Sequence, residues 1–468
     1  MIGACGTSGL RFGRLAPTRP WRAVAGLALL VLPGSAWAQA APAPTPDGFD
    51  VSGSIRLRYE AIDGQVRPGF NASDNLIDLR TIITATYKTG WFRVGGEVYD
   101  SRSYLGNHGT PLSTNEVNAI EPVQAWVAAD IADPFGPGTS LSLQGGRFQL
   151  NLGSRRLVAG DDYRNTTNGF TGIRADLGFR GKVKATFAYV LPQARLPDDL
   201  SSLLDNKVRF DRESFDQVLW GGTISRQRTI GVAMAELGFI HFGERDAPGR
   251  PTRDRSLNTV SARLVSGPKP GAFDYELEGM YQFGRIATSL SAAAPRLPVS
   301  AWFAHGAIGY TLPGGWKPRI AAELDIASGD RAGGSYGRFD SLFGMRRADT
   351  GPVGLYNVVA RTNVLTPGAR AEFAPGKRVD AMLSYRLLWL ESATDSFAGT
   401  GVRDASGRAG RFAGQQIDAR LRYWLVPQRL RFELDGVWLA KGRFLQDAPN
   451  APQTGDTKYL SVNLSASL

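Results

Sequence analysis

Residues 273–284, FDYELEGMYQFG, alternate two kinds of side chain without interruption. Phe273 and Leu277 fall on one face of an extended strand, whereas Asp274 and Glu278 fall on the other. Two folds produce this pattern. In a soluble sandwich the apolar face meets a core and the polar face meets water, whereas in a membrane barrel the apolar face meets lipid and the polar face lines an aqueous interior. One strand cannot separate these folds, but the rest of the chain can.

The alternation recurs about eighteen times along the 468 residues. We expect strands near 49–60, 77–88, 91–100, 120–131, 139–150, 170–178, 182–190, 216–225, 229–243, 255–266, 272–284, 301–311, 316–328, 367–374, 379–390, 414–425, 428–441 and 456–468. After the N-terminus there is no apolar run long enough for a membrane-spanning helix, which excludes a helical membrane protein.

The predicted connections alternate in length. Short ones fall at 89–90, 132–138, 179–181, 226–228, 267–271, 312–315, 375–378 and 426–427, and long ones include 101–119, 191–215, 329–366 and 391–413. A sandwich has no reason to place all its long loops at one end, whereas a bacterial outer-membrane barrel does. The sequence therefore predicts an all-β protein, a transmembrane antiparallel β-barrel of about 18 strands with short periplasmic turns and long extracellular loops.

Residues 1–38 have the three parts of a secretory signal peptide: a region with four arginines, an apolar core at 23–32 and an A-x-A-like end at Ala36–Ala38. Residues 39–48 are rich in Pro and Ala and are expected to be disordered, and 49–468 form the predicted barrel. Export through a cleaved leader and a barrel fold together predict the outer membrane of a Gram-negative cell. The mature chain would have 50 basic and 43 acidic residues, a net charge of +7, and no cysteine.

Arginines recur at the alternate strand positions that carry polar side chains. An arginine facing hydrocarbon costs ~2–4 kcal/mol near the midplane, so these side chains are expected to face the barrel interior. The candidate lumen residues on strands are Arg56, Arg58, Arg80, Arg174, Arg263, Arg319, Arg386, Arg420 and Arg422. Carboxylates such as Glu276 and Asp418 share this parity. Two interpretations stay open and can hold together: an internal salt-bridge network, and free arginines that draw an anionic solute through the lumen.

The strand near 139–150 changes phase. Leu141 and Leu143 share one parity and Phe148 and Leu150 share the other, so we expect a glycine bulge at residues 145–146 that turns Arg147 inward.

Catalysis is not expected. The three histidines, His108, His241 and His305, have no partner at metal-ligand or H-E-x-x-H spacing, and the sequence has no glycine-rich phosphate loop. We therefore expect no enzyme activity, no cofactor, no metal and no nucleic-acid partner.

Several short motifs occur in a characteristic order. They are Gly146-Arg147-Phe148-x-Leu150, Gly153-x-Arg155-Arg156-Leu157-Val158, Phe170-x-Gly172-Ile173-Arg174, Tyr275-Glu276-Leu277-Glu278 and Ala327-Ser328-Gly329-Asp330. Over nearly the whole mature chain, this order resembles the alginate export family of outer-membrane barrels. The resemblance implies an eighteen-stranded channel that passes an anionic uronate polymer out of the periplasm through an arginine-lined constriction. The implied lumen and constriction candidates are Arg147, Arg155, Arg156, Arg174, Arg420 and Arg422.

The chain departs from the family pattern at a few positions. Gly344 and Arg347 follow Leu342-Phe343 where a proline and a nearby histidine are expected, and Thr171 stands where the family tends to have aspartate. The last residue is Leu468 rather than an aromatic residue. These departures bear on the substrate more than on the fold.

The sequence thus predicts a monomeric channel in outer-membrane lipid that exports an acidic, alginate-like polysaccharide, with periplasmic secretion partners that deliver the chain. The alternative is an anion-selective uptake porin for small acidic solutes or oligosaccharides. A third class is an adhesin or structural barrel with a plugged lumen. We also expect that Arg420→Glu together with Arg422→Glu would weaken anion preference and leave assembly intact.

Overall fold

The computed structural model describes residues 47–347 and 349–468. The predicted signal peptide and nearly all of the predicted disordered segment lie outside these residues. The strands are β1 (Gly48–Asp63), β2 (Ser73–Thr89), β3 (Phe92–Tyr104), β4 (Asn118–Ala132), β5 (Ser140–Phe148), β6 (Phe170–Phe179), β7 (Val183–Pro192), β8 (Gln217–Ile230), β9 (Ala233–Glu244), β10 (Ser256–Ser266), β11 (Ala272–Ala287), β12 (Arg296–Thr311), β13 (Arg319–Ala327), β14 (Val364–Phe373), β15 (Val379–Trp389), β16 (Phe412–Val426), β17 (Leu430–Lys441) and β18 (Thr457–Ser467).

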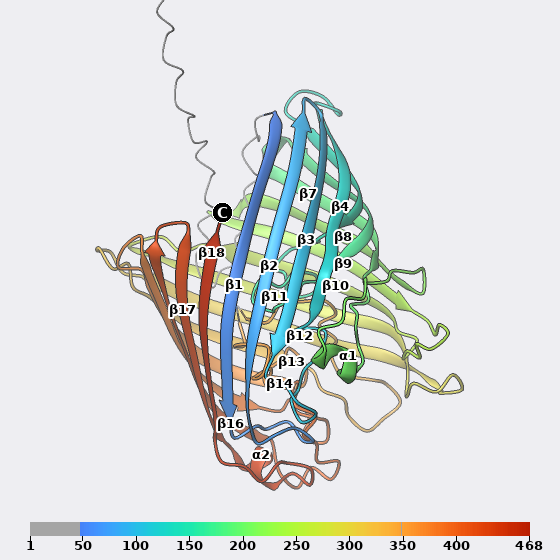
Figure 1. Cartoon of the computed structure of the whole chain (residues 1–468), viewed down its shortest axis with the longest axis vertical. Coiled ribbons are helices and arrows are strands. Elements are labelled where there is room, and N and C mark those ends of the chain that lie inside the picture. Colours follow the sequence, from blue (N-terminus) through green and yellow to red (C-terminus); the bar gives the residue numbers. More distant parts are fainter. Residues whose placement is uncertain (1–46, 348) are drawn as a thin grey trace, which may run out of the picture. The chain divides into compact units, whose positions relative to one another are not determined.

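These strands form one closed sheet (Figure 1). Each strand pairs antiparallel with the next in sequence, and β18 pairs with β1, as between Leu464 and Leu57. Closure satisfies the backbone hydrogen bonds of every strand, which a lipid environment demands. The predicted antiparallel barrel of 18 strands is confirmed.

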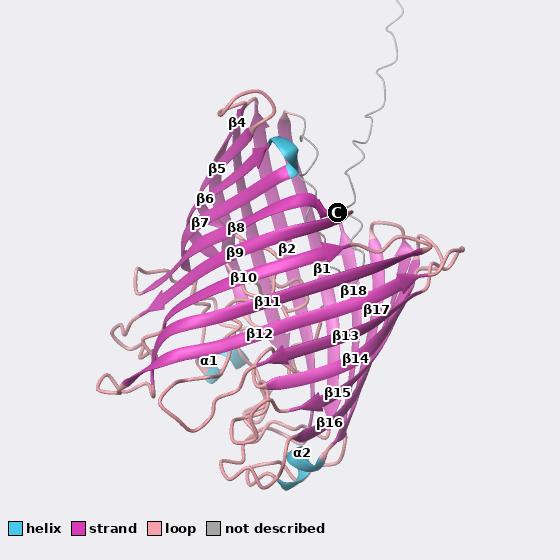
Figure 2. Cartoon of the chain, turned by 180° about the vertical axis from the view of Figure 1, so that it is seen from behind, coloured by secondary structure: helices cyan, strands magenta, loops and turns pink. Residues whose placement is uncertain are grey.

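The connections alternate as predicted. Short turns join β2 to β3, β4 to β5 and so on around the barrel, and the longer segments 64–72, 105–117, 149–169, 193–216, 245–255, 288–295, 328–363, 390–411 and 442–456 join the other pairs. The two short helices, α1 (Leu200–Leu204) and α2 (Arg443–Asp447), belong to long connections and lie at the same end of the barrel (Figure 2). The 3-10 turn Arg180–Lys182 lies in a short one. None of the helices in the described part of the chain has the length and apolar character needed to cross a bilayer.

The burial pattern of β11 decides between the two folds that its sequence allowed. Phe273 is 69% exposed and Leu277 is 53% exposed, whereas Asp274 is 2% exposed and Gln282 is completely buried. A sandwich would bury the apolar face, so this pattern is inverted relative to a soluble protein and matches a barrel with a lipid-facing exterior.

One predicted turn is misplaced. β8 continues to Ile230, so its hairpin with β9 turns at residues 231–232 and not at 226–228. The pairing shifts register after Arg226, and Arg228 has a positive φ of 56°. This irregularity interrupts the alternation that sequence reasoning uses to locate a strand end.

The predicted glycine bulge in β5 is wrong. β5 pairs in unbroken register with both β4 and β6, so Arg147 lies on the same face as Leu143 and does not turn inward. The apolar residues change faces because Phe148 is buried against an apolar cluster inside the barrel. Register shifts occur instead where β4 pairs with β3, near Tyr99.

Gly146 nevertheless has a special backbone. Its φ is +121°, and a Cβ atom there would lie 2.4 Å from the carbonyl oxygen of Ala125 on β4. Only glycine fits this close approach without a shift of the neighbouring strand.

Two long connections, residues 149–169 and 328–363, fold back into the barrel, and we call them the inner loops. The first contacts opposite parts of the wall, because Arg56 of β1 donates hydrogen bonds to the carbonyl of Arg164 (2.8 Å) and Arg156 pairs with Glu276 of β11 (2.6 Å). In the cyclic strand order, β1 and β11 stand far apart. The inner loops therefore cross the barrel interior.

Backbone hydrogen bonds join the two inner loops. The Phe343 N–H donates to the Leu157 carbonyl (2.9 Å), and the Ala159 N–H donates to the Phe343 carbonyl (3.2 Å). A Cβ atom at Gly344 would lie 1.9 Å from the Arg156 carbonyl oxygen, and the Gly344 N–H donates to the Ser341 carbonyl (2.9 Å). This packing explains why glycine, and not the family's proline, suits position 344 in this chain.

Candidate functional site

A buried ion-pair network ties the inner loops to β11. Arg156 lies 2.6 Å from both Glu276 and Glu278, and its Nε lies 2.8 Å from Asp349 of the second inner loop. Arg361, also in the second inner loop, pairs with the same Asp349. These charges are mutually compensated and fully buried, so they hold the loops in place and offer little to a passing solute.

The network continues along the wall. Arg319 pairs with Asp274 (2.6 Å) and Glu372 (2.9 Å). Arg386 pairs with Glu323 and with Asp325 (3.1 Å), and further paired groups follow on the neighbouring strands. Arginines and carboxylates of strands that are one or two positions apart thus neutralise one another across the sheet.

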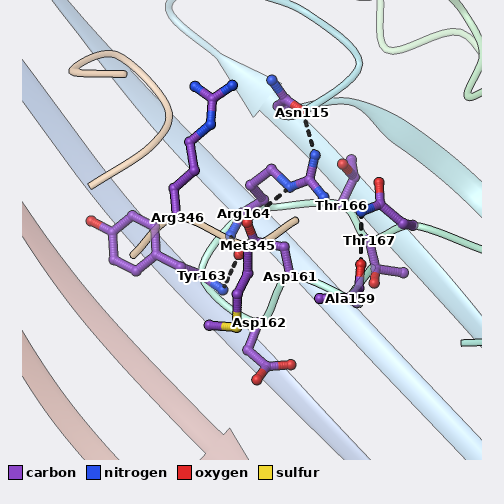
Figure 3. A network of polar contacts seen from close by, with 12 residues as sticks. Asn115, Ala159, Asp161, Asp162, Tyr163, Arg164, Thr166, Thr167, Met345 and Arg346 are labelled. Carbon is purple, nitrogen blue, oxygen red and sulfur yellow. Dashed lines mark hydrogen bonds and ion pairs between the residues drawn. The ribbon is translucent and has the colours of Figure 1, made fainter. Parts of the chain in front are cut away.

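Arginines of β1 and β2 bind the backbone of the first inner loop. Arg56 and Arg80 donate to the carbonyl of Arg164 at 2.8 and 2.9 Å. The Arg58 guanidinium lies 4.1 Å from the centre of the Tyr163 ring and donates to the Tyr163 carbonyl. These three candidates therefore hold loop 149–169 against the wall (Figure 3 shows the loop around Tyr163 and Arg164).

The second inner loop is anchored on the late strands. Arg347 pairs with Asp418 of β16 (2.8 Å) and with Asp435 of β17. Because Arg347 occupies Asp435, the cross-strand neighbour of Arg420, no carboxylate lies within ion-pair distance of Arg420 among the described residues. The adjacent Arg422 pairs with Asp380 at 2.7 Å.

The remaining candidates also have acidic partners. Arg147, on the same face of β5 as Leu143, pairs with Glu121 (2.6 Å) and Glu213 (2.7 Å). The others are Arg155 with Asp162 (3.2 Å), Arg174 with Asp176 (2.7 Å) and Arg263 with Glu276 (3.0 Å). Within the described chain, all twelve candidates except Arg56, Arg80 and Arg420 thus have a carboxylate partner. Their role in binding a substrate stays a prediction.

Two cavities of similar size have opposite charge. The first, about 290 Å³, adjoins the short turn at 267–271 and is lined by the carboxylates of Asp274, Glu276, Glu323 and Asp349, with Lys269 and Arg319 as its cations. The second, about 280 Å³, lies among the long connections and is lined by Arg164, Arg195 and Arg346, with Asp161 as its single carboxylate.

The three arginines of the second cavity were missed by sequence reasoning. They lie in the long connections 149–169, 193–216 and 328–363, where no strand alternation marks the direction of a side chain. Their charges are incompletely compensated. Burial and the neighbouring Arg164 lower the pKa of Arg195 to about 9. Burial, Arg164 and Arg361 lower the pKa of Arg346 to about 10.

Within residues 47–347 and 349–468, no group of three or more His, Cys, Asp or Glu side chains could hold a metal ion.

A family model described as alginate export matches residues 49–456. The chain belongs to the alginate export family. It is therefore an outer-membrane β-barrel of the channel-forming type. No curated protein matches the sequence.

Solved structures with the same fold are porins of Pseudomonas aeruginosa. OccK8 (OprE) has a TM-score of 0.55 and 13% identity, covering 90% of this chain and 98% of its own. OccK2 (OpdF) in complex with glucuronate has a TM-score of 0.55 and 13% identity, with 90% and 98% covered. OpdK with vanillate has a TM-score of 0.54 and 14% identity, with 90% and 100% covered. At this identity the likeness concerns the fold.

Proposed function

We propose that this member of the alginate export family conducts acidic saccharides across the outer membrane, with a preference for anions. The observation that carries the proposal is the uneven distribution of charge. Most candidate arginines of the wall are neutralised by neighbouring carboxylates, and Arg56 and Arg80 donate to loop carbonyls. By contrast, Arg195 and Arg346 at the long-loop end and Arg420 on the wall have no carboxylate within ion-pair distance in the described chain. Uncompensated arginines attract anions, and neutralised ones do not.

The size of the open space favours a small cargo. The inner loops cross the lumen and are fixed by buried ion pairs, and three cavities of about 290, 340 and 280 Å³ in the described chain would each hold one small ligand. In this conformation, uptake of a small acidic saccharide or organic acid is the best-supported activity. Glucuronate in the OccK2 complex and vanillate in the OpdK structure are acids of this kind.

Export of an acidic, alginate-like polysaccharide is the second candidate, and family membership favours it. A polymer chain would need the inner loops to leave the lumen, so the pairs of Arg156 and Arg347 would have to open. Export would also need periplasmic partners that deliver the polymer. We further infer that residues 1–38 are a cleaved signal peptide and that the barrel acts as a monomer.

The reversal potential in a planar lipid bilayer under a salt gradient tests the proposal. We expect anion selectivity and a reduced current when glucuronate is added on the long-loop side. A current blocked by polyuronate but not by glucuronate would favour polymer passage. A selective current that neither compound changes would point to a general porin, and no current at all would indicate a plugged structural barrel.

A further inference from the structure

The cationic cavity at the long-loop end is assembled from four separate connections. Asn115 comes from 105–117, Arg164 from 149–169, Arg195 from 193–216 and Arg346 from 328–363. Figure 3 shows Arg164 and Arg346 reaching from different loops beside Asn115. Residues that far apart in sequence form a cavity only in the folded barrel, and we call it the loop-end pocket.

Neutral oxygens hold the arginines of this pocket. Asn115 Oδ1 accepts hydrogen bonds from Arg164 Nη1 (2.9 Å) and Arg195 Nη2 (3.1 Å), which brings two guanidinium groups onto one amide. Arg195 Nη1 also donates to Asn168 Oδ1 (2.5 Å), and Arg346 Nη1 donates to Asn357 Oδ1 (2.6 Å). These oxygens orient the arginines without cancelling their charge.

The lining of the pocket has three arginines and one carboxylate, Asp161, while Asp211 and Glu116 act on Arg195 from farther away. Asp161 Oδ2 lies 3.3 Å from Arg164 Nε, and in the described chain neither Arg195 nor Arg346 has a carboxylate within ion-pair distance. Buried arginines are normally paired, because removing an uncompensated charge from water is costly. The pocket thus carries an excess of positive charge that an anion would neutralise.

Unsatisfied polar groups point to the same conclusion. Gln193 lines the pocket and is 8% exposed, yet both its Oε1 and its Nε2 lack a hydrogen-bond partner in the structure. The buried Nη2 of Arg164 also lacks one. Buried polar atoms almost always have partners, so donors and an acceptor left open in a cavity indicate a bound polar group.

The lining also has an apolar part. Leu342, Phe343 and Val353 contribute to the pocket, and the Phe343 ring is fixed by edge-on contacts with Phe170 (5.4 Å) and Phe242 (5.6 Å). An apolar surface beside convergent polar groups is typical of a small-molecule site. A volume of about 280 Å³ suits one sugar ring and not a polymer segment.

We propose that the loop-end pocket is a subsite that binds the carboxylate of one sugar acid, with Arg195 and Arg346 as its anion-binding side chains. The proposal rests on the acidic-saccharide function given above and names the residues that first capture the solute. Gln193 would bond to sugar hydroxyl groups, and Phe343 would contact the apolar face of the ring.

Isothermal titration calorimetry on the full-length barrel in detergent tests the subsite. The probes are glucuronate, glucose and inorganic phosphate. We expect glucuronate to bind, glucose not to bind, and Arg195→Gln and Arg346→Gln each to weaken glucuronate binding at least about tenfold, the loss expected when a charge-assisted contact is removed. Arg346→Lys keeps the charge and should retain part of the affinity.

Arg443→Gln is the matched control, because Arg443 is an exposed arginine that pairs with Asp447 in another long connection. Its glucuronate affinity should equal that of the unaltered protein. Heat-modifiable migration in SDS gels shows that each variant has folded. Equal glucuronate affinity in Arg346→Gln and the unaltered protein, or equal binding of glucose, would overturn the subsite. Tighter binding of phosphate than of glucuronate would also overturn it, because the site would then be a general anion site.

The reversal potential of the same variants separates this proposal from the proposed function. A glucuronate-blocked, anion-selective channel in which the two substitutions change neither binding nor block refutes the subsite and leaves the function intact. A non-selective channel refutes the function, whereas calorimetry still decides whether the pocket binds a sugar acid.

Discussion

Two charged cavities in the described part of the chain have nearly the same volume, about 290 and 280 Å³, but differ in how their arginines are compensated. Near the short turn at 267–271, arginines are paired and carboxylates are in excess, so the charges stabilise the wall and its inner loops. In the loop-end pocket, arginines are held by amide oxygens and keep their charge. The number of arginines in a lumen therefore says little about anion binding, because the neighbouring groups determine which arginines remain available.

Arg156→Gln should cause the largest change, a loss of stability at the paired cavity near the short turn. The substitution removes the cation shared by Glu276, Glu278 and Asp349, and breaking a buried pair from one side costs about 3–5 kcal/mol. Urea unfolding in lipid vesicles should show a lower midpoint. The exposed control Arg443→Gln should change the free energy of unfolding by less than about 1 kcal/mol. If both variants unfold at the same midpoint, the paired network does not stabilise the barrel.

The titration of Glu116 predicts how the stability of the protein depends on pH. Burial raises the pKa of this carboxyl group, which adjoins Asn115, to about 7. The folded state then binds more protons than the unfolded state between about pH 4.5 and 7, so stability should fall as the pH rises through this window and stay constant above it. The expected loss is about 3 kcal/mol at most.

Comparison with Glu116→Gln isolates this effect, because Asp211 is another buried carboxyl group with a pKa raised to about 7. The unfolding midpoint should fall more steeply between pH 5 and 8 in the unaltered protein than in the variant. Parallel pH profiles would refute the assignment to Glu116.

Arg346 and Arg361 lie in the same inner loop and should respond oppositely to substitution. Arg346→Gln removes an uncompensated charge and should stabilise the fold by roughly 1 kcal/mol, a trade-off typical of binding sites. Arg361→Gln leaves Asp349 with one partner fewer and should destabilise it. The two thermal unfolding temperatures, measured without ligand, check this difference in sign. Destabilisation by both substitutions would show that the pocket arginines are structural as well.

The smallest effect is expected for Arg420→Gln. Substitution of Arg420 should change ion selectivity, whereas substitution of the adjacent Arg422 should change stability. Arg420→Gln should lower the anion-to-cation permeability ratio by roughly twofold or less, since one lumen charge among many is removed. Arg422→Gln should instead lower stability, because Asp380 loses its partner at 2.7 Å. For this reason we no longer expect the double substitution to glutamate to leave assembly intact. An unchanged reversal potential in Arg420→Gln would exclude this arginine from ion selection.

Strand positions were largely predictable, because a two-residue period and alternating connection lengths are local properties of the chain. β11 shows this most clearly, since its exposed Phe273 and buried Asp274 follow directly from parity. One error, the β8–β9 turn, arose from a register shift after Arg226, and the other arose where an apolar side chain faces the interior. Phe148 looked like a break in phase at Gly146, because the sequence does not show that the inner loops form an apolar cluster inside the barrel.

The sequence predicted that arginines face the barrel interior, but it did not predict which groups they contact. Inward-facing arginines on strands follow from parity, but their partners do not, because Arg347 and Asp349 reach the wall from a long loop whose path is set by tertiary contacts. For the same reason, the arginines of the loop-end pocket carried no sequence signal.

The barrel, its alternating connections and the faces of most strands follow from the sequence alone, since each of these depends on residues close together along the chain. Which arginines are neutralised and which keep their charge depends on the tertiary structure. Ion pairs depend on distances of a few ångströms between residues such as Arg156 and Asp349, and those distances arise only when the loops fold into the closed barrel.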